Sequence, residues 1–128
     1  MIIKNYFILY VSSQEAGTRF YESVLNCPPR LNVPGMTEFE LSEDCILGLM
    51  PEAGIKRLLN GKIPDPAEAG GIPRAELYLL TDCAQEYIER AVKAGAVELS
   101  GFVERDWGHR AAYFYDPDHH IIAFAQEM

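Results

Sequence analysis

The segment YFYDPDHHIIAFAQ, residues 113–126, is the most informative part of the sequence about the fold. Two apolar and aromatic runs flank the polar turn DPDHH, which is the pattern of two strands joined by a tight turn. Its adjacent histidines, His119 and His120, also raise the question of a metal site. Neighbouring residues on a strand point to opposite faces, so these two side chains cannot bind one ion from a regular strand. We therefore interpret both histidines as polar residues of a surface turn.

An earlier stretch of the chain repeats this pattern. The segment FELSEDCILGLM, residues 39–50, aligns without a gap on FYDPDHHIIAFA, residues 114–125, at an offset of 75 residues. Apolar periodicity around the two segments predicts the same order twice: one strand, one helix and three strands. The expected strands are 2–11, 30–33, 36–42, 45–50, 74–81, 96–104, 108–116 and 120–126, and the expected helices are 12–26 and 82–95. The sequence therefore predicts a single α+β domain, 1–128, built from two βαβββ halves, 1–60 and 74–128, with a Pro- and Gly-rich connector, 61–73.

The helix ends supply the alignment of the first strands of the two halves. Ser12 or Ser13 is expected to cap the first helix, and Asp82 is expected to cap the second. Placing the last apolar residue of the first helix, Leu25, on that of the second, Ala94, gives an offset of 69 residues for the first strand and helix of each half.

Composition restricts the classes of partner. Acidic residues outnumber basic ones, 19 against 11, which gives a formal net charge of −8. That charge disfavours nucleic-acid backbones and anionic membranes, and it favours cationic or neutral small molecules. The three cysteines are odd in number and lack disulfide or zinc spacing, which indicates a reducing compartment. No apolar run reaches the length of a membrane span, so we expect a soluble cytoplasmic protein.

Two motifs carry a resemblance to a known family. FYESVL, residues 20–25, and WGHRAAYFYDPDHHIIAFAQ, residues 107–126, resemble the glyoxalase, bleomycin-resistance and extradiol-dioxygenase superfamily, the vicinal oxygen chelate proteins. The resemblance covers nearly the whole chain and implies two modules whose curled mixed sheets surround a ligand cavity. It also implies a homodimer. His119 stands where the family's turn usually has glycine, which fits the tolerance of histidine for positive φ.

The resemblance also indicates where metal-dependent members keep their four ligands. Those positions fall on Tyr6, Gly48, Ala75 and Ala123, and a slip of one residue would put Glu76 in place of Ala75. Three of the four have no donor side chain, and a neutral tyrosine is a poor ligand for a divalent ion. We therefore expect no resident metal or other cofactor.

Strand alternation predicts which side chains face the cavity. Phe7, Leu9, Val11, Phe39 and Phe114 are expected to point to the opposite, helix-covered side. His109, in the loop sequence DWGHR, is either a cavity residue or a solvated loop histidine. The residues expected to line the cavity are Tyr6, Ile8, Tyr10, Glu38, Glu40, Gly48, Met50, Ala75, Leu77, Trp107, His109, Tyr113, Tyr115 and Ala123, with Leu79 beside them.

Three functions are compatible with these features. The first is a metal-independent protein that binds a cationic or aromatic small molecule in an apolar, tyrosine-lined pocket with few carboxylates. The alternative is a metal-dependent lyase, isomerase or dioxygenase of the superfamily with non-standard ligands. A third reading, an interaction module whose cavity is filled by its own side chains, is disfavoured by the small residues at Gly48, Ala75 and Ala123, because small residues leave space.

Overall fold

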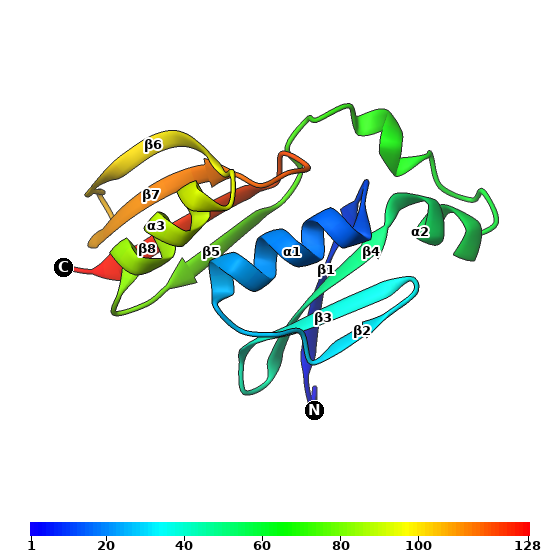
Figure 1. Ribbon diagram of the computed structural model, residues 1–128, viewed down its shortest axis with the longest axis horizontal. Coiled ribbons are helices and arrows are strands. Elements are labelled where there is room, and N and C mark those ends of the chain that lie inside the picture. Colours follow the sequence, from blue (N-terminus) through cyan, green and yellow to red (C-terminus); the bar gives the residue numbers. More distant parts are fainter. The chain divides into compact units, whose positions relative to one another are not determined.

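Two four-stranded mixed sheets organise the computed structural model, which describes residues 1–128 (Figure 1). Each sheet belongs to its own compact unit. Unit 1 comprises Met1–Glu22 and Asn26–Gly70, and unit 2 comprises Ser23–Leu25 and Gly71–Met128.

Unit 1 contains the first sheet, with strand order β1-β4-β3-β2. Strand β1 runs parallel to β4, and the other neighbours are antiparallel. Helix α1 packs against the sheet at Gly17, where a Cβ atom would lie at contact distance, 3.4 Å, from the side chain of Leu49. The elements are β1 (Asn5–Val11), α1 (Gln14–Leu25), β2 (Leu31–Val33), β3 (Met36–Ser42), β4 (Cys45–Pro51), α2 (Glu52–Leu58) and the 3-10 helix η1 (Pro66–Ala69).

Unit 2 repeats this topology, with strand order β5-β8-β7-β6 and β5 parallel to β8. Figure 1 shows α3 lying against β8, where the ring of Tyr87 stacks on that of Phe124 with centroids 6.2 Å apart. The elements are β5 (Glu76–Leu80), α3 (Ala84–Lys93), β6 (Val97–Glu104), β7 (His109–Tyr115) and β8 (Ile121–Glu127). The predicted fold class, two tandem βαβββ modules, is confirmed.

The helix caps agree with the sequence prediction in the first half only. Ser13 caps α1, with its hydroxyl oxygen accepting the amide N–H of Ala16 at 3.1 Å. The predicted cap of α3 by Asp82 is wrong, because Cys83 occupies the N-cap position and provides no side-chain hydrogen bond. Instead Gln126 of β8 accepts the amide N–H of Ala84 at 3.1 Å, so a neighbouring strand satisfies the donor at the start of α3.

The core of each unit lies on the helix-covered side of its sheet. Phe39 in unit 1 and Phe114 in unit 2 are fully buried, as alternation predicts. Their strand neighbours Leu47 and Ile122 are also fully buried, directly opposite them in the register. Each such side chain contributes about 1.5–3 kcal/mol to the free energy of unfolding through burial.

The β7–β8 turn corrects one prediction for the two histidines. His119 is exposed and adopts φ 64°, as expected at a turn-glycine position, and its ring stacks on Tyr115 with centroids 4.4 Å apart. His120 is not a surface residue, because only 4% of it is exposed. Its Nδ1–H donates to the Asp116 carboxylate at 3.0 Å, since a carboxylate only accepts.

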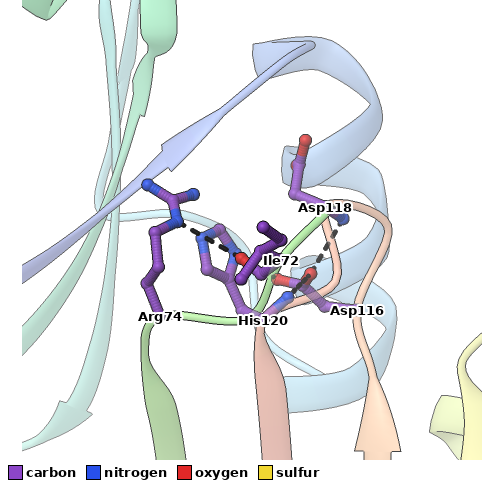
Figure 2. A network of polar contacts seen from close by, with 5 residues as sticks. All are labelled: Ile72, Arg74, Asp116, Asp118 and His120. Carbon is purple, nitrogen blue, oxygen red and sulfur yellow. Dashed lines mark hydrogen bonds and ion pairs between the residues drawn. The ribbon is translucent and has the colours of Figure 1, made fainter. Parts of the chain in front are cut away.

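A second set of hydrogen bonds, from backbone N–H groups to the same carboxylate, fixes the conformation of the turn (Figure 2). The other oxygen of Asp116 accepts the backbone N–H groups of Asp118 and His120, at 2.8 and 2.9 Å. Figure 2 also shows Arg74, which donates to the carbonyl of Ile72 just before β5. Asp116 and His120 are therefore structural residues that close the turn.

Candidate functional site

The sheet of unit 1 presents one face opposite its helices, called the Gly48 face here. The register places Tyr6 beside Ile46, Ile8 beside Gly48 and Tyr10 beside Met50, so alternation assigned these residues to one face correctly. Glu38 and Glu40 of β3 pair with Gly48 and Ile46 and belong to the same face. The prediction that Phe7 packs under the helices is wrong, because 60% of Phe7 is exposed near the start of the edge strand β1.

The space above Gly48 is filled by its neighbours. A Cβ atom on Gly48 would lie 3.0 Å from Ile8 Cγ1 and 3.3 Å from Met36 Sδ. Glu38 is largely buried and pairs with Arg30, whose Nε lies 3.5 Å from its carboxylate. The inference that a small residue at position 48 leaves open space is therefore wrong, and only Glu40 offers an exposed carboxylate on this face.

The sheet of unit 2 has a corresponding surface, called the Ala123 face here, whose register differs from the predicted one by a residue. Tyr78 pairs with Ala123, and Ala123 pairs on its other side with Tyr113. Leu77 pairs with the buried Ile122 and therefore lies on the helix-covered side, together with Leu79. The prediction that Leu77 and Leu79 face the cavity is wrong.

The assignment of Ala75 to a ligand position is corrected by the same shift. Ala75 precedes β5, and its carbonyl accepts the N–H of Ile121 at 3.1 Å. Glu76 takes the position equivalent to Tyr6, since Tyr6 pairs with Ile46 and Glu76 with Ile121. The cause is helix length: α1 has 12 residues and α3 has 10, so an alignment anchored on the helix ends misplaces the strands before them.

A cluster of three polar aromatic side chains stands on the Ala123 face. The indole Nε1–H of Trp107 donates to the hydroxyl of Tyr78 at 2.8 Å, and that hydroxyl lies 2.6 Å from Nδ1 of His109. Trp107 is 54% exposed, while His109 and Tyr78 are half-buried. Trp107 and His109 were predicted site residues, and the structure brings them together around Tyr78, which the sequence analysis missed. The sequence could have indicated Tyr78 through the alternative register of its strand, because the one-residue slip that replaces Ala75 by Glu76 also turns Tyr78 to this face.

Tyr113 extends the cluster along β7. Burial raises the pKa of the Tyr113 phenol above its ordinary value, the Glu76 carboxylate and the Tyr78 phenol raise it further, and Arg105 opposes them. The guanidinium carbon of Arg105 lies 5.2 Å from the centroid of the Tyr113 ring. Arg105 also donates to the carbonyls of Gly101 and Ala111, across the irregularity in the β6–β7 register, so this cation is held by the backbone.

The residues at the family's ligand positions do not fit a divalent metal. Tyr6, Gly48, Glu76 and Ala123 include one carboxylate and one phenol, and the other two have no donor side chain. No group of three or more His, Cys, Asp or Glu side chains gathers where it could hold one ion.

Burial and the carboxylates of Glu22 and Glu40 raise the pKa of the Cys27 thiol, which keeps it protonated and weakly nucleophilic.

Two pockets lie away from the predicted cavity residues. One in unit 1, about 570 Å³, lies between α1 and β2 and includes Gln14 and Asn32. One in unit 2, about 310 Å³, lies at the end of the sheet and includes Phe102 and Arg110. Neither contains a predicted site residue.

None of the helices is both long enough and apolar enough to span a membrane.

Comparison with known proteins places this geometry in a family. The model of the glyoxalase-like domain matches residues 4–128. A glyoxalase-related enzyme from Fulvimarina pelagi superposes with a TM-score of 0.79 at 21% identity, over 95% of this chain and 86% of that one. A glyoxalase/bleomycin resistance protein/dioxygenase from Nocardioides gives 0.78 at 21% identity, over 100% and 84%. A glyoxalase/bleomycin resistance protein from Catenulispora acidiphila gives 0.71 at 19% identity, over 99% and 100%.

At these identities the solved structures support the fold alone, and no curated protein matches the chain. The family model, by contrast, covers the sequence from the start of the first strand to the last residue. The chain belongs to the glyoxalase-like domain family.

Proposed function

We propose that the chain is a metal-independent small-molecule-binding protein that takes an aromatic or cationic ligand on the Ala123 face. The observation that carries the proposal is the cluster of Trp107, Tyr78 and His109. An indole that is 54% exposed yet oriented by a hydrogen bond offers a flat surface for stacking or for cation–π contact. Glu76, exposed on the same face, is the carboxylate available to a cationic ligand.

The donor set favours this function over metal-dependent chemistry. A lyase or dioxygenase mechanism of the superfamily's metal-dependent kind needs several ligands around one ion. Glu76 is the single carboxylate among the four equivalent positions, and His109 already engages Tyr78 through Nδ1. By family resemblance we further propose a cytoplasmic homodimer, in keeping with three free cysteines.

Trp107 makes the site directly observable because it is the only tryptophan in the sequence. The experiment is a titration of chelator-treated protein with aromatic and cationic probes, 2-naphthol and benzyltrimethylammonium, followed by tryptophan fluorescence. We expect a saturable change with at least one probe and no effect of added Zn²⁺, Ni²⁺, Mn²⁺ or Fe²⁺. If neither probe changes the emission, or if a probe binds only after a divalent metal is added, the proposal fails.

A matched pair of variants localises the binding. Tyr78→Phe removes the hydroxyl that orients Trp107 and His109, and we expect it to weaken binding about three- to tenfold, the worth of a hydrogen bond. Tyr87→Phe removes a hydroxyl on the helix-covered side, where Tyr87 stacks on Phe124, and should leave the affinity unchanged. Equal effects of the two substitutions would place the ligand elsewhere.

A further inference from the structure

The hydrogen bonds around Tyr78 favour one position for the ring proton of His109. The indole Nε1–H of Trp107 can only donate, so the Tyr78 oxygen is an acceptor in the 2.8 Å bond. The hydroxyl proton of Tyr78 therefore points elsewhere, and Nδ1 of His109 lies 2.6 Å away. That separation is shorter than the 2.9–3.0 Å typical of N–H···O bonds and matches a hydroxyl donor. This distance favours Tyr78 as the donor to Nδ1, and the tautomer of His109 that accepts there carries its ring proton on Nε2.

This Nε2–H is available to a ligand. His109 makes no other hydrogen bond through its side chain, and no buried side-chain nitrogen or oxygen in the chain lacks a partner, so Nε2 reaches solvent. It stands beside the indole of Trp107, since both residues bind the same hydroxyl. The Ala123 face therefore combines an exposed aromatic plane with one oriented N–H donor.

We infer that the ligand of this site is a planar aromatic molecule carrying a carbonyl-type oxygen, which accepts the Nε2–H of His109 while its ring lies against Trp107. This inference rests on the proposed binding function and narrows its ligand class. Tyr78 is a positioning residue in this arrangement, because it fixes the tautomer of His109 and the orientation of Trp107. A site that presents a donor discriminates against an analogue without an acceptor, because the donor then loses its bond to water without replacement.

The first test needs no ligand. Long-range ¹H–¹⁵N correlation spectra of the wild-type protein, at about pH 8 where imidazole is neutral, distinguish a protonated nitrogen from a bare one in each histidine. We expect His109 to carry its proton on Nε2, and we expect Tyr78→Phe to produce a mixture of tautomers. A proton on Nδ1 in the wild-type protein would overturn the inference.

The second test uses two probes of the same shape, acetophenone and α-methylstyrene, in which a C=CH₂ group replaces the C=O group. Titrations followed by the indole N–H resonance of Trp107 should give acetophenone a Kd about tenfold lower, the worth of one hydrogen bond. His109→Gln, which keeps an N–H donor, should preserve much of this preference, whereas His109→Leu should remove it.

The outcomes separate the inference from the function beneath it. If both probes shift the Trp107 resonance with equal Kd, the face binds aromatic molecules but His109 is not the donor, and the inference fails while the proposed function stands. If neither probe shifts the resonance, the inference fails, and the proposed function fails with it only when 2-naphthol and benzyltrimethylammonium are also without effect.

Discussion

Replacement of Asp116 by alanine should be among the most destabilising single changes in unit 2. Asp116 is 3% exposed, and its carboxylate accepts the backbone N–H groups of Asp118 and His120 as well as the Nδ1–H of His120. Hydrogen bonds to a charged group contribute about 1.5–3 kcal/mol each. Because the turn relaxes and water enters when the carboxylate is gone, the total should be smaller than the sum, about 3–5 kcal/mol.

The assay is urea denaturation followed by far-UV circular dichroism and by Trp107 fluorescence. Asp116→Asn keeps an oxygen for the two backbone N–H groups but loses the charge, so we expect a smaller loss, about 1–2 kcal/mol. Asp82→Ala is the matched control, because Asp82 is exposed and does not cap α3, and it should stay within about 0.5 kcal/mol of the wild type. The reasoning is refuted if Asp116→Ala costs no more than Asp82→Ala.

Three further predictions follow from single contacts. Gly48→Ala should lower the free energy of unfolding by about 1–2 kcal/mol in denaturation experiments, since its Cβ would lie 3.0 Å from Ile8 Cγ1. Ile8→Ala removes that atom, so the double variant should lose less than the sum of the two single losses, whereas additive losses would contradict the contact. His119→Val should lower the free energy of unfolding by about 1–3 kcal/mol, because a β-branched residue is strained at φ 64°, and His119→Gly should lower it less. A lower melting temperature for His119→Gly than for His119→Val would contradict this prediction. Glu76→Gln should lower the pKa of Tyr113 in a phenolate absorbance titration, since the Glu76 carboxylate raises it, and an unchanged pKa in the variant would exclude the pairing. Because the pKa of Tyr113 is higher in the folded than in the unfolded state, the wild type should lose stability as the pH rises above about 10.

The fold was predictable because its signals are local and repeated. Alternation along residues 39–50 and 114–125 places Phe39 and Phe114 in the core without any knowledge of packing, and the turn between the strands of each pair sets the register. The gap-free offset of 75 residues holds in the structure, where Ile46 and Ile121 occupy equivalent places in their sheets.

The site was harder to predict because it depends on one residue of register. Equivalent helices can differ in length without changing a fold, so an alignment anchored on the helix ends shifted β5 by one residue. That shift assigned Leu77, in place of Tyr78, to the Ala123 face. The burial of His120 was invisible for a different reason. Polar residues in a turn are usually exposed to solvent. Here the Asp116 carboxylate makes the hydrogen bonds to His120 that water would otherwise make.

The central claim is that a small molecule binds beside Trp107 without a metal. Its most direct test is a ¹H–¹⁵N spectrum of chelator-treated protein titrated with 2-naphthol and benzyltrimethylammonium. We expect at least one of them to produce a saturable shift of the Trp107 indole resonance that is unchanged by added divalent metal and weakened by Tyr78→Phe. An indole resonance that does not move, or that moves only once a metal is present, would contradict it.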